Sequence, residues 1–121
     1  MAVDFLDFFQ RAEVYDNVTT VVYSKNLPIN TLISGYIQVA ANRVSNGDNK
    51  SWFKAFTAER RAAGAVLGTV QDIFTPFGDS GTSAWDVSIG VSGNNVELRM
   101  TGQAATATTQ FAFKVFVMVI Q

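Results

Sequence analysis

The chain has 121 residues, of which 48% are hydrophobic and 16% are charged, and its formal net charge is -1. This composition is typical of one globular domain with a modest core, and it excludes an intrinsically disordered chain. The near-neutral charge argues against binding of nucleic acid or of a membrane surface, and the absence of cysteine and histidine removes disulfides, thiolate metal sites and the commonest general base.

The first sixteen residues are rich in phenylalanine and differ from the rest of the chain. Phe5, Leu6, Phe8 and Phe9 fall at mixed spacings that fit either one or two helical turns or the start of a strand. These side chains need burial, either against the domain's own sheet or against a neighbouring subunit. Acidic residues interrupt them and no cationic start precedes them, so we expect no signal peptide. No apolar run in the chain approaches the roughly 20 residues of a membrane helix.

After this segment, turn signals recur about every ten residues, and the runs between them are rich in β-branched and aromatic residues. Asn46-Gly47 is the strongest short hairpin signal among them. Gly35 interrupts one run and indicates a β-bulge or a close approach of two backbones. The expected strands are residues 18–23, 31–44, 52–61, 66–74, the two arms of a hairpin at 84–101, and 107–120, with a loop at 75–81.

The hairpin at residues 84–101 has the clearest pattern. Apolar and polar residues alternate on both sides of the turn Ser92-Gly93-Asn94-Asn95, so each arm has one buried face and one wet face. A two-residue loop at Gly93-Asn94, with glycine first as a type II′ turn requires, gives one register, and a loop at Asn94-Asn95 would keep the same faces in step. The expected pairs are Val91 with Val96, Ile89 with Leu98, and Val87 with Met100.

The last strand, 107–120, is apolar along one face and turns apolar on the other face near its end. Phe116, Met118 and Ile120 carry this second apolar face. Because a sandwich strand normally keeps one wet face, we expect the Phe-rich start or another subunit to cover these three residues. We therefore predict a subunit interface at Phe116, Met118 and Ile120.

The residues that carry chemistry form no convincing site. Paired carboxylates hydrolyse glycosides without histidine, but cross-strand polar pairing on the wet face of the hairpin explains Asp86 and Glu97. Turn geometry explains Asp48 and Asp79 better than a calcium loop does. We expect no enzymatic activity, no cofactor and no metal.

Two aromatic residues are candidates for a platform on which a sugar ring stacks. They are Tyr36 and Trp52, although such residues in a sandwich of this size are more often core or rim residues. Together the elements predict an all-β protein, an antiparallel β-sandwich of jelly-roll-like type. Residues 1–16 are expected to form a short N-terminal arm and residues 17–121 the sandwich domain.

From Val18 onwards the sequence resembles the small β-sandwich domain found at the ends of tail-fibre and related virion proteins of tailed bacteriophages. The matching features are Val18-Thr19-Thr20, Ile37-Gln38-Val39, Trp52, the turn Arg60-Arg61-Ala62-Ala63-Gly64, Leu67-Gly68-Thr69, Ala84-Trp85-Asp86-Val87-Ser88, Val91-Ser92-Gly93-Asn94, Val96, Met100-Thr101-Gly102-Gln103-Ala104 and Phe113-Lys114-Val115.

The resemblance implies a bacteriophage virion structural protein that assembles as a homotrimer and is located in the virion. In that family the module ends a long fibre, whereas here it makes up nearly the whole chain, which favours a capsid decoration protein or a head or tail appendage knob. Such a protein would attach to capsid or tail proteins through an arm carrying Phe5, Leu6, Phe8 and Phe9. The alternative is a host-receptor or glycan-binding module at a tail-fibre tip, with Tyr36 or Trp52 as the platform. We expect no nucleic-acid or membrane partner.

Overall fold

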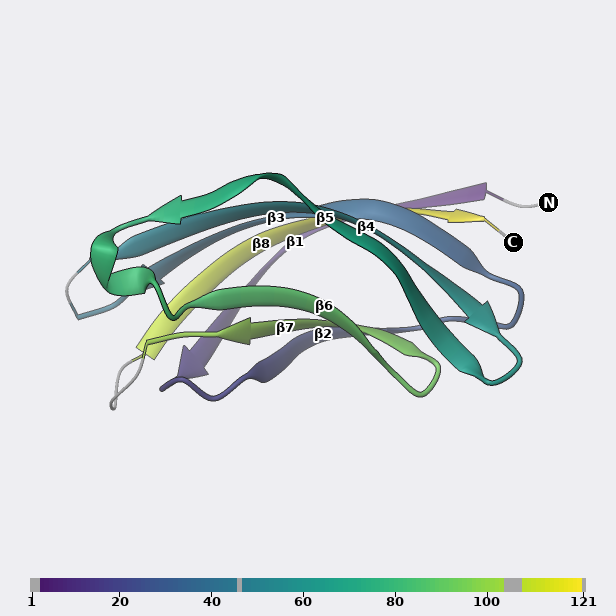
Figure 1. The fold of residues 1–121 in the computed structure, drawn as a ribbon, viewed down its shortest axis with the longest axis horizontal. Helices are drawn as coiled ribbons and strands as arrows, with labels where there is room; N and C mark the ends of the chain where they lie inside the picture. Colours follow the sequence, from purple (N-terminus) through teal and green to yellow (C-terminus); the bar gives the residue numbers. More distant parts are fainter. Residues whose placement is uncertain (1–2, 46, 104–107, 121) are drawn as a thin grey trace.

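The computed structural model describes residues 3–45, 47–103 and 108–120, and for residues 3–9 it describes the backbone alone. Two antiparallel sheets form a sandwich, which confirms the predicted fold class (Figure 1). One sheet has five strands in the order β1-β8-β3-β4-β5, and the other has three in the order β2-β7-β6. The strands are β1 (Val3–Tyr15), β2 (Thr20–Asn26), β3 (Leu32–Arg43), β4 (Asn49–Arg61), β5 (Gly64–Gly78), β6 (Asp86–Ser92), β7 (Asn95–Thr101) and β8 (Thr108–Ile120), with a short 3-10 turn, η1 (Ser80–Thr82), between β5 and β6.

The jelly-roll type is not confirmed, because β3, β4 and β5 follow one another as a meander in one sheet. The described ranges contain no helix of the length and apolarity needed to cross a membrane.

The Phe-rich start forms an edge strand of the domain's own sheet. β1 pairs with β8 along its whole length, from Val3 opposite Ile120 to Tyr15 opposite Thr108. Of the alternatives open from the sequence, the strand that joins the domain's own sheet is therefore the one found. Residues 3–15 of the arm expected at residues 1–16 are therefore an edge strand of the sandwich, because β8 gives them a hydrogen-bonding partner along their whole length.

The expected loop at 75–81 was also partly wrong, because β5 continues to Gly78. Its far end pairs Phe77 with Ser51 across an irregular register. Pro76 lies within this stretch, and proline is tolerated there because β5 is an edge strand with one unpaired side.

The hairpin β6–β7 has the predicted register in every pair, including Ile89 opposite Leu98. Gly93 has a φ of 57° while Asn94 keeps a negative φ, as a type II′ turn requires. The turn also joins the two sheets, because the Ala65 amide on β5 donates to the Gly93 carbonyl at 2.8 Å. On the side of its own sheet, the Leu27 amide directly after β2 donates to the Asn94 carbonyl at 2.9 Å.

The core lies between the sheets. The inner faces of β3, β4 and β8 pack against those of β6 and β7, and this burial of apolar surface is the main force holding the sandwich together. The largest fully buried side chains include Trp52, Phe111, Phe113, Leu27, Ile33, Ile37 and Met100.

Gly35 marks a close approach between β3 and β8. A Cβ atom at this position would lie 2.1 Å from the Phe116 carbonyl oxygen. The register of β3 with β4 and with β8 runs through Gly35 without a shift. Of the two predicted roles for this glycine, the close approach is confirmed and the bulge is not found.

Candidate functional site

The outer face of the five-stranded sheet, the side turned away from the three-stranded sheet, carries a connected group of aromatic rings. In Figure 1 the three-stranded sheet lies against one of the two faces of the larger sheet. Directly opposed residues of antiparallel strands share a face, and alternation along each strand then places one set of side chains outward. We call five of these outward rings the aromatic band: Phe116, Tyr36, Phe53, Phe74 and Phe77.

Each ring of the aromatic band contacts the next, from β8 across β3 and β4 to β5. Phe116 stacks on Tyr36 with ring centroids 5.1 Å apart and an interplanar angle of 19°, and Tyr36 lies 5.4 Å from Phe53. Phe53 meets Phe74 edge-on at 5.7 Å, and Phe74 lies 5.5 Å from Phe77. These separations are those of favourable aromatic pairs, so the band is a continuous apolar surface.

The aromatic band is only partly covered by the chain. Tyr36 is 42% exposed, Phe74 38% and Phe77 61%, and Leu32 on the same face is 41% exposed. Monomeric soluble proteins rarely expose contiguous apolar patches of large area, and such patches mark interaction sites. The outer face is therefore the candidate functional site.

The predicted interface residues Phe116, Met118 and Ile120 all lie on this outer face, and each is half-buried. β8 is an inner strand of the sheet, so the backbone at these positions is paired with β1 on one side and β3 on the other. Their role in subunit contact stays a prediction.

The four predicted arm residues lie on the edge strand β1. Phe5, Leu6, Phe8 and Phe9 are opposite Met118, Val117, Val115 and Lys114 in the register with β8. Their side chains lie outside the part that the structure describes, so their role in attachment stays a prediction.

The two platform candidates are separated by the sheet. Tyr36 is on the outer face, whereas Trp52 is 1% exposed and lies in the core. Trp52 is opposite Val39 on the inner face and packs 6.0 Å from the ring of Phe111, with the Lys50 ammonium 5.4 Å from its own ring centroid. The proposal of Trp52 as a surface platform was wrong.

Sequence reasoning missed three members of the aromatic band. Phe53 was hidden beside Trp52, because alternation places adjacent aromatics on opposite faces without saying which one points outward. Phe74 ended an expected strand, and Phe77 fell in an expected loop. A regular hairpin around residues 62–63 would not have aligned Phe53 with Phe74, because the β4–β5 pairing brings them opposite each other only after register shifts.

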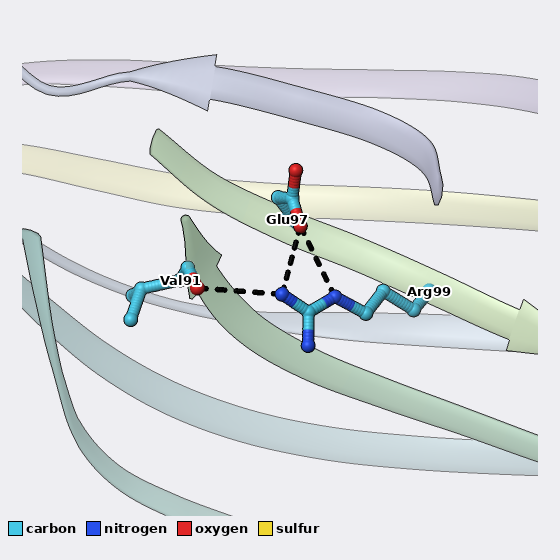
Figure 2. Close-up of polar contacts among 3 residues, drawn as sticks. All are labelled: Val91, Glu97 and Arg99. Atoms are coloured by element: carbon cyan, nitrogen blue, oxygen red, sulfur yellow. Dashed lines mark hydrogen bonds and ion pairs between the residues drawn. The ribbon is translucent and has the colours of Figure 1, made fainter. Parts of the chain in front are cut away.

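The wet face of the hairpin holds an ion pair (Figure 2). The Arg99 Nη2 atom lies 2.8 Å from Glu97 Oε1, and the same nitrogen donates to the Val91 carbonyl at 3.3 Å. The partner of Glu97 is thus on its own strand, and the expected cross-strand pairing is not what holds it. Asp86 is opposite Thr101 and Glu97 is opposite Gly90, so four residues, about 13 Å of strand, separate the two carboxylates along the sheet.

Three other carboxylates, those of Asp72, Glu59 and Asp79, have structural partners. Asp72 accepts from the Lys54 ammonium at 2.6 Å, and Glu59 pairs with Arg61. Asp79 accepts from the Asn49 amide at 2.9 Å and so fixes the turn before β4. Among the described residues, no group of three side chains that favour metal ions comes together.

Comparison with known proteins finds likeness in structure alone. No family model matches the chain, and no curated protein sequence matches it. The tailspike protein of Acinetobacter baumannii phage AM24 superposes with a TM-score of 0.54 over 93% of this chain and 26% of the tailspike chain, at 11% identity. This likeness shows a shared fold.

Two further tailspikes superpose less closely. That of Acinetobacter baumannii bacteriophage Fri1, described as a capsular polysaccharide depolymerase, has a TM-score of 0.46 and 9% identity over 94% of this chain. That of Acinetobacter phage vB_ApiP_P1 has a TM-score of 0.43 and 18% identity over 88% of this chain. The chain spans 26%, 17% and 21% of the lengths of the three tailspike chains.

Proposed function

We propose that this chain is a structural domain of a bacteriophage tail appendage, of tailspike or tail-fibre type, that works as a homotrimer within the virion. The observation that carries the proposal is the aromatic band, an apolar surface that the described residues cover only in part. Neighbouring copies would bury the apolar end of the outer face, where Phe116, Met118 and Ile120 lie beside Tyr36 and Leu32. Burial of such a surface is the usual driving force of permanent subunit association.

A tail location is favoured over a capsid location. The fold is shared with a domain of the AM24 tailspike at a TM-score of 0.54, and the sequence resemblance is to tail-fibre domains. Capsid decoration, which the sequence left open, draws no support from either source. The proposed partners are other copies of this chain and other proteins of the tail.

Attachment to the rest of the particle is assigned to the segment that carries Phe5, Leu6, Phe8 and Phe9. Because β1 is an edge strand, its outer backbone edge is not paired within the sheet. An unpaired edge is a template for strand addition by another chain. The proposal therefore places attachment at the free edge of β1 and not at a detached arm.

We assign no enzymatic activity to the domain. Asp72, Glu59 and Glu97 are held in ion pairs with Lys54, Arg61 and Arg99, and the chain lacks histidine, the commonest general base.

The second candidate function is binding of a host-surface glycan. It is favoured by the exposed ring of Tyr36 on the outer face, since a half-open aromatic ring with a hydroxyl suits a ligand that is both apolar and polar.

The test of the assembly is the molar mass of the full chain in solution by light scattering after size exclusion. We expect the mass of three chains for the wild type and of one chain for Phe116→Asp, because an unpaired carboxylate cannot be buried in an apolar contact. Val21→Asp, on the exposed side of the three-stranded sheet, is the matched control and should stay trimeric. A wild-type monomer would contradict the proposal.

The test of location is electron microscopy of particles labelled with gold-conjugated antibody against this chain. Label on the tail is the expected outcome. Label over the capsid shell would contradict the tail assignment and restore the decoration protein.

A further inference from the structure

Residues that face each other across the strands of the larger sheet form rows on its outer face. The polar row is Glu13, Gln110, Asn42 and Asn49, on β1, β8, β3 and β4. The next row, which we call the floor row, is Arg11, Ala112, Ala40, Ser51 and Phe77. The third row is Lys114, Gln38, Phe53 and Phe74.

The floor row lies at the bottom of a trough. A hollow of about 610 Å³ lies over the polar row, and a second of about 390 Å³ lies toward the third row. Ala40, Ser51 and Ala112 line both hollows, so the two form one trough that crosses the strands at right angles. Five strands spaced about 4.8 Å apart give it a length of about 19 Å, and its volume is in the range of ligand sites.

The polar row offers hydrogen-bonding groups of both kinds. The side-chain amides of Asn42, Asn49 and Gln110 each have a donor and an acceptor. Gln110 Nε2 is 3.4 Å from Glu13 Oε1, and Asn49 Nδ2 is 3.5 Å from the Gly47 carbonyl. These distances are longer than those of strong hydrogen bonds, so the amides have capacity for a ligand whose hydroxyls both donate and accept.

The end of the trough at β5 is aromatic. Phe77 is 61% exposed and Phe74 is 38% exposed, with their ring planes 44° apart. Exposed ring faces of this kind pack against the C–H face of a pyranose. The trough thus has a polar wall for hydroxyls and an apolar end for a sugar ring.

The charges and the backbone pairing of the trough argue against two classes of ligand, polyanions and peptides that bind by strand addition. The trough is lined by the cations Arg11 and Lys114 and the anion Glu13, and the Lys50 ammonium is engaged with the Thr82 and Trp85 carbonyls at 3.2 and 3.1 Å. Such a field is too weak to select a polyanion. An extended peptide that binds by strand addition needs an unpaired sheet edge, whereas the central floor lies on β8, β3 and β4, which are paired on both sides.

We infer that this trough binds a linear, uncharged or weakly charged saccharide chain that lies across the strands. The inference rests on the second candidate function above, and it moves the ligand from Tyr36 to the neighbouring trough. The apolar end of the face, at Met118 and Ile120, stays available for subunit contact.

The test is a nuclear magnetic resonance titration of the ¹⁵N-labelled full chain with two probes, maltohexaose and chitohexaose. With at least one probe, we expect shift changes at the backbone amides of Ala40 and Ala112 and at the side-chain amides of Asn42 and Gln110. Asn42→Ala with Gln110→Ala should weaken binding about tenfold. Gln71→Ala, an exposed glutamine of the same sheet away from the trough, should leave the affinity unchanged.

Ala112→Trp fills the floor from the solvent side and should abolish the titration, whereas Val21→Trp on the other sheet should not. Shift changes confined to Tyr36 and its neighbours would overturn this site and keep glycan binding. Absence of shift changes with both probes would overturn the inference and leave the trimer unaffected. Loss of the trimer mass in Ala112→Trp would show that another copy occupies the trough, which also overturns it.

Discussion

The two faces of strand β8 differ in what covers them. On the inner face, Phe111, Phe113, Val115 and Val117 are each 1% or 2% exposed, and the three-stranded sheet lies across from them. On the outer face, Phe116, Met118 and Ile120 are half-buried, although they belong to the same strand and have the same neighbouring strands, β1 and β3. The inner face is completed by the chain itself, whereas the apolar end of the outer face has no covering layer among the described residues.

The difference separates residues that fold the chain from residues that associate it. An inner ring gains its burial when the domain folds, and full burial of a phenylalanine contributes about 1.5–3 kcal/mol. A ring of the aromatic band gains part of that burial from its neighbouring rings, and the remainder is available only on contact with another molecule. Mutations on the inner face should therefore change the folding equilibrium, whereas mutations on the outer face should change the association equilibrium.

The largest expected effect comes from comparing the truncation of one phenylalanine on each face of β8. Phe113→Ala leaves a cavity in the core and should lower the free energy of unfolding by about 3–5 kcal/mol. Phe116→Ala, three residues away, should lower it by under about 1 kcal/mol for the monomer, while raising the concentration at which the trimer dissociates. Urea denaturation and light scattering measure the two quantities. Equal losses of folding stability would show that the outer face is also part of the core.

A smaller effect is expected where β3 approaches the β8 backbone most closely. In Gly35→Ala the added methyl group would meet the Phe116 carbonyl oxygen at 2.1 Å, so the two strands must separate locally. We expect a loss of about 1–3 kcal/mol in the free energy of unfolding. Ser34→Ala, the adjacent position on the opposite face, is the control and should change it by no more than about 0.5 kcal/mol. If Gly35→Ala were neutral in urea denaturation, the close packing of β3 against β8 would be wrong.

Local patterns predicted the parts of the fold whose causes are local. The β6–β7 register followed from alternation on both sides of Gly93-Asn94, since a one-residue slip would have turned Ile89 to the wrong face. The second apolar face of β8 was likewise predicted, from the alternating positions of Phe116, Met118 and Ile120. The place of that strand between β1 and β3 was not, because strand order depends on contacts distant in sequence.

The candidate site was predicted in part, and its errors have non-local causes. Trp52 and Phe53 are adjacent aromatics, and the choice of which one points outward is made by the β3 register that sets Trp52 opposite Val39. Phe77 follows Pro76, which locally favours a loop, but an edge strand accommodates the missing amide. The trough was invisible in sequence because its rows join residues of five strands.

The smallest expected effect lies at the margin between the two sheets, where Tyr23 is half-buried opposite Leu98. Burial raises the pKa of the Tyr23 phenol above its ordinary value of 10.0. The folded chain then binds this proton more tightly than the unfolded chain does. The associated stability is complete below about pH 10 and is lost as the pH rises from the unfolded pKa through the folded pKa.

Tyr23→Phe has no proton to lose, so its free energy of unfolding should fall less than that of the wild type between about pH 9 and pH 11. Urea denaturation at the two pH values gives the difference for each protein, and the wild type should show a modestly larger fall. Other groups that titrate in this range are common to both proteins and cancel in the comparison. Curves that fall in parallel would mean that the Tyr23 hydroxyl is solvated. The two sheets would then not bury the side chain at this margin of the sandwich.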